Sequence, residues 1–188
     1  MDLRAAAGTL LVSVPQMMDP NFMHSVVLIC EHGEAGALGL MVNRPSPSGL
    51  SELLPKHPVF SKLDFEVFAG GPVGLDTLQF VHRVPDQIEG GVELSNELVF
   101  GGNMEQLAEF LREAPEPESS VRLFLGYAGW GEGQLDAELG TGSWVPVPPD
   151  ADLVFSRETS GAVWRSALRS IGAAGDDLSQ LPPDVSWN

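Results

Sequence analysis

Apolar residues follow one another in short runs along this chain, and polar residues, glycines and prolines separate the runs. Short runs rich in β-branched residues are typical of strands. On this criterion strands are predicted at residues 9–14, 25–32, 37–43, 65–69, 77–81, 121–130 and 143–148. Residues 25–32 are apolar almost throughout, so both faces of that strand should be covered. Prolines interrupt residues 143–148, which predicts a strand at the edge of the sheet.

Two longer segments have the spacing of amphipathic helices. Residues 104–113 carry apolar side chains on one face, Asn103 can cap this helix, and Gln106 follows three positions later. Residues 163–171 also carry an apolar face, which predicts a helix packed on the sheet and ended by Gly172. Shorter helices are predicted within residues 49–54 and 131–139.

The predicted strands come in groups without regular alternation with helices, which argues against a doubly wound parallel sheet. We therefore expect an α+β fold. Residues 25–32 and 37–43 should pair as a hairpin across the turn between them. The glycine–proline link between residues 65–69 and 77–81 predicts a second hairpin or a tight crossover. Because 188 residues with 43% hydrophobic residues can bury a substantial core, we expect a single domain over residues 1–188.

The chain is strongly acidic, with 10 basic and 26 acidic residues and a formal net charge of −16. Such a surface does not neutralise phosphates, so direct nucleic-acid binding is disfavoured. It also repels anionic membranes, and no stretch approaches the roughly 20 apolar residues of a membrane-spanning helix. One cysteine cannot form an internal disulfide or supply the thiolates of a zinc ribbon, which fits a reducing compartment. We expect a soluble, cytoplasmic protein.

The single cysteine lies in the sequence Cys30-Glu31-His32, at the end of a predicted strand. Alternate residues of a strand share a face, so Cys30 and His32 are expected to point one way and Glu31 the other. Their Cα atoms would stand about 6–7 Å apart, which is poor geometry for direct thiolate–imidazole pairing. We expect Cys30 to pack as a small apolar side chain. The alternative is a thiol-dependent enzyme or redox sensor that uses Cys30 and His32.

Metal and nucleotide sites have weak support. Asp19, His24, Glu31 and His32 lie close in sequence, but no two histidines have a metal-site spacing such as H-x-H or H-x-x-x-H. His57 and His82 are isolated, so surface or capping roles are predicted for them. Glycine-rich stretches at residues 69–74, 100–103 and 126–133 match no phosphate-binding motif, and turns or close packing explain them better. We predict no metal and no cofactor.

Several motifs taken together resemble a known family. They are "PQMMDPNFMHSVVLICEHGEAGALGLMVNRP", "AGGPV", "GYAGWGEGQLDAEL" and "SWVPVPPDADLVF", followed by a tryptophan-containing helix. In this order they are similar to the YqgE/AlgH family of bacterial proteins. The resemblance implies a bent, largely antiparallel sheet folded into a pseudo-barrel with flanking helices. It implies no established enzymatic activity, and part of the family name comes from a proposed role in regulating transcription of exopolysaccharide genes.

The family's recurrent positions can be carried onto this sequence. They are Asp19-Pro20, Glu31-His32, Gly36-Ala37, Asn43-Arg44-Pro45, Gly70-Gly71-Pro72-Val73, Gly129-Trp130 and Gly133-Gln134-Leu135. The candidate ligand- or partner-binding residues among them are Asp19, Glu31, His32, Asn43, Arg44, Trp130 and Gln134. The Arg44 guanidinium could bind carboxylates of the protein itself or an acidic ligand. The segment "DTLQFVHR" and the tail "LPPDVSWN" depart from the family pattern.

We thus predict a non-enzymatic binding or regulatory protein that acts through an unknown protein partner or a small ligand. Any role in transcription would be indirect, because the charge disfavours contact with DNA. The polar candidates at the ends of the predicted hairpin form one site only if the strand register brings them together.

Overall fold

A computed structural model of the protein describes residues 5–180, and the tail at residues 181–188 that departs from the family pattern lies outside this range. The strands are β1 (Leu10–Ser13), β2 (Val26–Gly33), β3 (Gly36–Met41), β4 (Val67–Ala69), β5 (Val73–His82), β6 (Val92–Ser95), β7 (Leu98–Phe100), β8 (Val121–Trp130) and β9 (Trp144–Val147). The helices are α1 (Leu50–Leu53), α2 (Met104–Glu113), α3 (Gln134–Gly140), α4 (Ala151–Val154), α5 (Ser160–Arg169) and α6 (Ala173–Gln180), with 3-10 turns η1 (Phe60–Lys62) and η2 (Pro117–Ser119).

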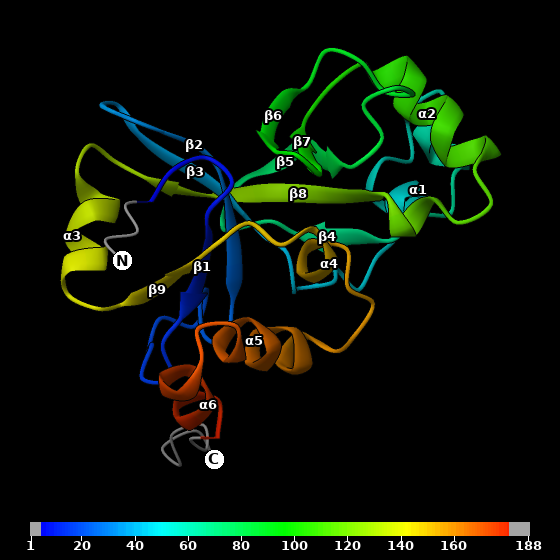
Figure 1. The fold of residues 1–188 in the computed structure, drawn as a ribbon. Coiled ribbons are helices and arrows are strands. Elements are labelled where there is room, and N and C mark those ends of the chain that lie inside the picture. Colours follow the sequence, from blue (N-terminus) through cyan, green and yellow to red (C-terminus); the bar gives the residue numbers. More distant parts are fainter. Residues whose placement is uncertain (1–4, 181–188) are drawn as a thin grey trace.

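The described strands form one sheet in the order β6-β7-β5-β8-β3-β2-β1-β9, with β4 paired to β8 beside this path. The pairs are antiparallel except β4–β8, which is parallel. The sheet is bent and stays open, because β6 and β9 form its two ends (Figure 1). Helices flank it, which confirms the α+β class and the largely antiparallel sheet. The predicted hairpin of β2 with β3 and the edge position of β9 are confirmed as well.

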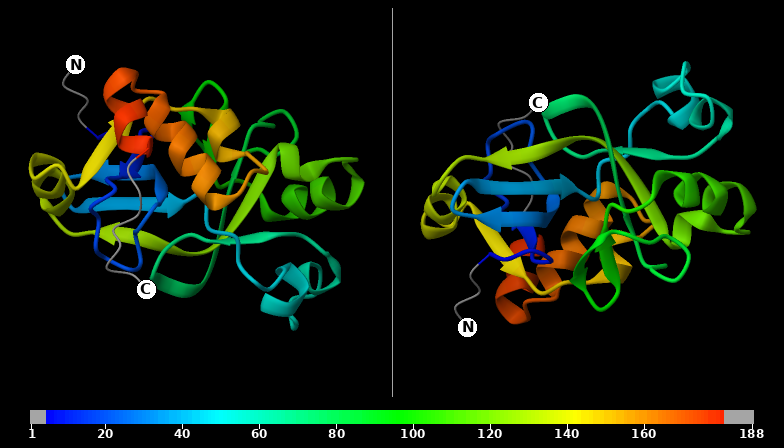
Figure 2. Two further views of the ribbon diagram at one scale, coloured as in Figure 1. Left: turned by 90° about the horizontal axis from the view of Figure 1, so that it is seen from below. Right: turned by 90° about the horizontal axis from the view of Figure 1, so that it is seen from above.

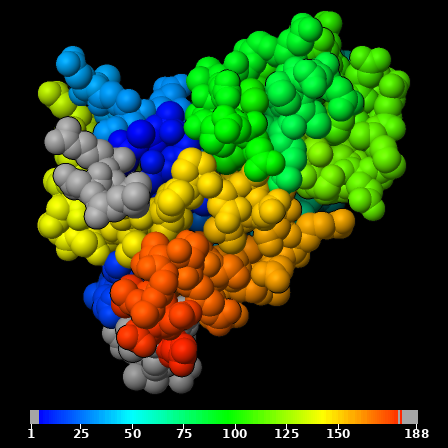
Figure 3. Space-filling view, viewed as in Figure 1, coloured from blue at the N-terminus to red at the C-terminus, as the bar shows by residue number. Residues whose placement is uncertain are grey.

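Strand β8 connects the two halves of the molecule. Its last residues, Ala128–Trp130, pair with β3, whereas Leu123–Leu125 pair with β4, and β5 runs antiparallel along much of its length. β1, β2, β3 and β9 therefore lie toward one end of β8, and β4 to β7 lie toward the other (Figure 1). In Figure 3 the green segments around β5 to α2 gather in one half, and α5 and α6 (orange to red) cover the lower part of the other.

Three buried apolar clusters stabilise this arrangement. The first lies between the β1–β2 part of the sheet and α5, and Trp164 of α5 also donates its indole N–H to the Ser13 carbonyl at 2.8 Å. This confirms the predicted amphipathic helix, which lies against the sheet in Figure 2. The second cluster lies under α1 and α2. The third lies under α3, around Trp130 and Trp144.

The link between β4 and β5 is a tight crossover, one of the two alternatives predicted from its glycines and proline. β4 and β5 both pair with β8, and the chain passes from one to the other over the backbone of β8. A Cβ atom on Gly71 would lie 2.0 Å from the Tyr127 carbonyl carbon, and one on Gly70 would lie 2.3 Å from the Gly126 carbonyl oxygen. Only glycine fits such a close backbone approach. Gly70 and Gly71 therefore serve close packing, as predicted for their stretch.

The two isolated histidines have different environments. Nδ1 of His57 accepts hydrogen bonds from the backbone N–H groups of Val59 and Phe60, which agrees with a capping role. His82 of β5 is fully buried, contrary to a surface position, but its Nδ1 accepts the Val84 N–H at 3.3 Å, which agrees with a local capping role. Its Nε2 bonds the Gly101 carbonyl at 3.1 Å. Burial lowers the pKa of His82, so its imidazole is neutral near pH 7.

No helix among residues 5–180 is long and apolar enough to cross a membrane.

Candidate functional site

The hairpin register separates the predicted site residues into two groups. β2 pairs with β3 from Val27–Met41 at one end to Gly33–Gly36 at the turn. Glu31 and His32 therefore lie near the turn, whereas Asn43 lies beyond the opposite end. At a rise of about 3.3 Å per residue the two groups are about 20 Å apart. The structure does not bring the hairpin candidates together at one place.

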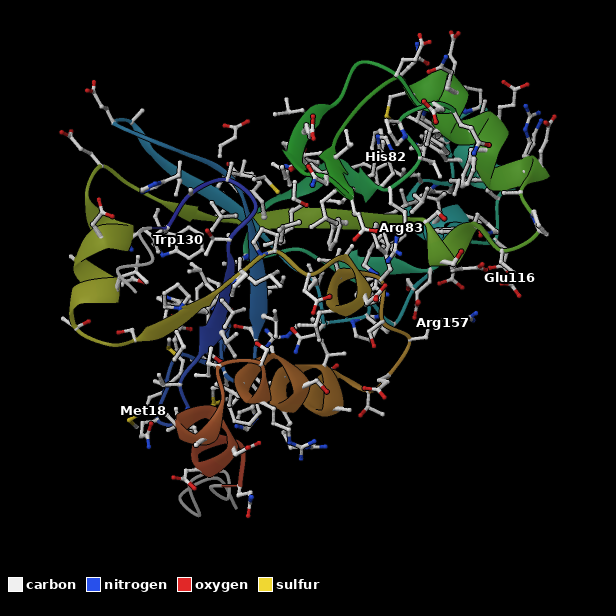
Figure 4. The ribbon with its side chains drawn as sticks, in the orientation of Figure 1. Met18, His82, Arg83, Glu116, Trp130 and Arg157 are labelled. Carbon is white, nitrogen blue, oxygen red and sulfur yellow. The ribbon has the colours of Figure 1, made fainter. Side chains whose placement is uncertain are left out.

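The group near the turn lies beside α3 and is joined by a hydrogen-bonded carboxylate. Glu138 Oε2 accepts the indole N–H groups of Trp130 at 3.0 Å and Trp144 at 2.8 Å. Its Oε1 accepts the Gln134 side-chain amide at 2.9 Å. The predicted candidates Trp130 and Gln134 thus meet at Glu138, and the two indoles tie α3 to the sheet. Figure 4 shows Trp130 beside α3.

The remaining two candidates in this group are more loosely held. His32 Nε2 lies 3.7 Å from Asp136 Oδ1 of α3. Glu31 is exposed and stands opposite Leu38 in the β2–β3 pair. The Asp136 side chain is largely exposed, so this contact contributes little stability beside the hydrogen bonds of Glu138.

At the other end, Arg44 holds the loop that precedes β2. Its guanidinium donates hydrogen bonds to the backbone carbonyls of Asn21 and, at 3.1 Å, Met23. Asp19 opens the same loop, where its carboxylate accepts the Asn21 N–H at 2.8 Å. These partners are backbone carbonyls, and no ion pair joins Arg44 to a carboxylate within residues 5–180, contrary to one of the two expectations for it. Binding of an acidic ligand by Arg44 stays a prediction.

Asn43 is buried, and both the oxygen and the nitrogen of its side-chain amide form hydrogen bonds. Its Oδ1 accepts the Val26 N–H at 2.9 Å, and its Nδ2 donates to the carbonyls of His24 at 2.8 Å and Ser160 at 3.0 Å. One side chain thereby joins β2, the end of β3 and the start of α5. Asn43 also forms part of the wall of a pocket that the sequence did not predict.

This pocket has a volume of about 180 Å³ and lies between the end of β3, strand β4 and the segment joining α4 to α5. Its buried lining residues are Val42, Asn43, Phe68, Arg122 and Val163. Its exposed lining residues are Pro45, Glu66, Arg157 and Glu158, with Ser156 half-buried between the two sets. Arg157 lies at the outer side of this region in Figure 4. The pocket thus has a buried floor and a charged rim.

Arg122 of β8 is the distinctive group of the floor, with only 4% of its surface exposed. Its guanidinium donates to the carbonyls of Val42 at 2.8 Å and Ser156 at 2.7 Å, and Cζ lies 4.0 Å from the centre of the Phe68 ring. None of these partners is an anion. Among residues 5–180 no carboxylate lies within ion-pair distance of Arg122.

Burial lowers the pKa of Arg122 to about 10, while the nearby Glu66 carboxylate acts in the opposite direction. Arg122 therefore stays protonated at neutral pH, and a full positive charge is buried at the pocket floor. The sequence contained a signal for it, since Arg122 is the one charged residue in the apolar run Val121–Trp130. A lone charge in a buried strand needs a partner, and this marks it as a candidate.

A larger hollow of the described surface lies elsewhere. It is an open groove of about 820 Å³ along α2, with Glu109, Glu113 and Glu116 around Phe110. It holds no buried charged side chain, and its glutamates face water, as Figure 4 shows for Glu116. We therefore place the candidate site at Arg122.

Cys30 does not form a nucleophilic site with His32. A β-bulge interrupts the pairing between Ile29 and Glu31, which breaks the strict alternation that would place Cys30 and His32 on one face. Cys30 packs in the first cluster, whereas His32 lies beside α3, whose Leu135 belongs to the third. Burial raises the pKa of the Cys30 thiol far above its usual range, so it is protonated.

No group of three or more His, Cys, Asp or Glu side chains in residues 5–180 is arranged to hold a metal ion.

Comparison with known proteins agrees with the resemblance seen in the motifs. A family model described as AlgH-like matches residues 10–175. The chain is 38% identical over 165 residues to a UPF0301 protein of Chlorobaculum tepidum, which covers 88% of this chain and 86% of that protein.

Two solved structures share the fold. The solution structure of the AlgH protein from Pseudomonas aeruginosa has a TM-score of 0.70 and 30% identity, and the match covers 97% of this chain and 98% of that one. A crystal structure of a Corynebacterium diphtheriae protein has a TM-score of 0.77 and 25% identity, with 96% and 95% covered. With the family model spanning most of its length, this chain belongs to the AlgH-like family.

Proposed function

We propose that this protein is a non-enzymatic binding protein whose pocket at Arg122 takes the carboxylate of a small ligand. The buried guanidinium of Arg122, held by carbonyls and an aromatic ring rather than by an anion, is the observation that carries the proposal. Burying a charge without a counterion costs several kcal/mol. A bound carboxylate would supply that countercharge, and the planar guanidinium fork matches its geometry.

The remaining lining favours binding over catalysis. Ser156 contributes a hydroxyl to the wall, but this oxygen accepts the Glu158 N–H at 3.2 Å, and the described lining places no histidine or cysteine beside it. A hydroxyl nucleophile needs such a base to be activated. The thiol alternative draws no support either, because Cys30 is buried and protonated.

A regulatory role follows if occupancy changes how the protein meets a partner. The pocket wall combines the end of β3, strand β4 and the start of α5, so a ligand there would link elements of both halves. Effects on transcription would then be indirect, through the ligand or a protein partner, since a net charge of −16 disfavours contact with DNA.

The test is binding of propionate to the full chain, followed by NMR chemical shifts and by thermal unfolding at ionic strength matched with chloride. We expect saturable shifts confined to residues 42–45, 66–68, 122 and 156–158, and a melting temperature that rises with propionate concentration. An Arg122→Lys variant, which keeps the charge but loses the fork, should bind more weakly, and a Lys56→Gln control should bind normally. Propionate that acts no differently from chloride would refute the proposal.

A further inference from the structure

The rim of the Arg122 pocket is negative in net charge, opposite to the positive charge of its floor. Glu66 and Glu158 are exposed at the rim, together with one cation, Arg157. With Arg122 the lining holds two cations and two carboxylates, so its formal charge is zero. The charges are separated by depth: the floor is cationic, and the rim carries both carboxylates.

Glu66 is near Arg122 without neutralising it. The Glu66 carboxylate raises the pKa of Arg122 against the larger effect of burial, so the two charges interact. Their atoms nevertheless do not form an ion pair, and Glu66 remains solvated. Space between a buried cation and an exposed carboxylate suits a ligand with both an anionic and a cationic group.

We propose, resting on the proposed function, that the ligand is a small zwitterion of the amino-acid type. Its carboxylate binds Arg122 on the floor, and its ammonium group faces Glu66 and Glu158 at the rim. Its side chain is short and apolar, because Val42, Phe68 and Val163 give the floor an apolar surface beside Asn43.

The volume of the pocket limits the size of the ligand, and the charges of its rim disfavour a phosphate dianion. A volume of about 180 Å³ equals roughly six waters at about 30 Å³ each, which corresponds to a ligand of about six to eight heavy atoms. Alanine and valine fall within that range. A phosphate dianion has to approach past Glu66 and Glu158, and the single rim cation, Arg157, offsets their repulsion only in part, whereas a zwitterion carries a cation of its own.

Three compounds that share the same branched four-carbon group separate the contributions of the two charges: valine, 3-methylbutanoate, which lacks the amine, and isobutylamine, which lacks the carboxylate. Binding of each to the full chain is measured by titration calorimetry. We expect valine to bind at least tenfold more tightly than 3-methylbutanoate, and isobutylamine to bind most weakly.

The double variant Glu66→Gln/Glu158→Gln tests the rim. It should reduce the affinity for valine to that of 3-methylbutanoate, while 3-methylbutanoate binds as well as before or better, since repulsion is removed. A Glu52→Gln/Glu118→Gln double variant, with two carboxylates removed outside the pocket lining, should retain the preference for valine. Retained binding of 3-methylbutanoate also shows that the double variant is folded.

The outcomes distinguish the two proposals. Equal binding of valine and 3-methylbutanoate, or an undiminished preference in the rim variant, would overturn the zwitterion and leave the carboxylate site standing. Binding of isobutylamine alone, or of none of the three compounds, would overturn both.

Discussion

Burial disfavours the charged form of both Cys30 and Arg122, which raises the pKa of the thiol and lowers the pKa of the guanidinium. For the thiol, loss of water disfavours the charged form, raises the pKa and leaves an inert, neutral side chain. For the guanidinium, the same desolvation lowers the pKa only to about 10, and the charge persists at neutral pH. Of these two buried side chains, only Arg122 keeps a charge with which it can bind an anionic ligand.

Cys30 should therefore be unreactive in the folded protein. It is 2% exposed and protonated, so a thiol reagent such as DTNB should label it only on unfolding. The reference for the labelling rate of an accessible thiol is a Cys30→Ser/Glu34→Cys variant, whose one cysteine lies at the exposed hairpin turn. Native Cys30 reacting at a rate similar to this reference would revive the thiol hypothesis.

The residue scale also shows what sequence reasoning could and could not find. The sequence marks Asn43-Arg44 as a candidate site, yet these side chains bind the backbone of residues 21–26 and Ser160, which are distant in sequence. Such partners follow from tertiary packing. Arg122 could have been found, because a charge inside an apolar strand is visible without a structure.

At the scale of elements, local signals predicted most boundaries. Strand β8 occupies the predicted residues, and Asn103 Oδ1 caps α2 by accepting the N–H groups of Glu105 and Gln106. The Gln106 side chain does not complete a capping box, since its Oε1 accepts the Glu89 N–H instead. The sequence patterns do not predict the β6–β7 hairpin, which has exposed, charged positions, α4, which has a single turn, or α6, which follows Gly172.

The crossover over β8 makes a sharp prediction at this scale. Gly71→Ala should lower the free energy of unfolding by about 3 kcal/mol or more, because its Cβ would meet the rigid backbone of Tyr127 and Ala128.

The matched control is Gly140→Ala at the end of α3, where a Cβ meets nothing within 4 Å. It should change stability by less than about 1 kcal/mol, and toward stabilisation, given the helix propensity of alanine. Urea unfolding measures both. Equal stability of the two variants would mean that β8 moves aside at little cost.

At the scale of the whole molecule, pairing along one strand joins the two halves. β8 contributes to the first core through Phe124, to the second through Leu123 and to the third through Trp130. The order of elements along the chain predicts the fold class, but it does not predict that β8 contributes to all three clusters. Nothing local in the sequence of β8 reveals that it pairs with β3, β4 and β5.

The shared strand predicts cooperative unfolding. Trp130, Trp144 and Trp164 lie outside the cluster under α2, so their fluorescence reports mainly on the other half. Leu107→Ala in α2 should cost about 2–5 kcal/mol and still lower the fluorescence-detected melting temperature, by about 2–4 °C per kcal/mol.

An exposed Glu113→Gln change on the same helix is the control and should leave the melting temperature unchanged. If Leu107→Ala instead split the far-UV circular dichroism transition in two, with the fluorescence midpoint unmoved, the halves would be independent units.

The position of β8 in the chain also fixes an order of events during synthesis. β3, β4 and β5 leave the ribosome well before β8, which begins at Val121, and all three pair with it. Until β8 emerges their edges lack a partner, and unpaired edges are where nascent chains associate wrongly. The interval between synthesis of β5 and synthesis of β8 is thus when the nascent chain is most prone to associate with other chains.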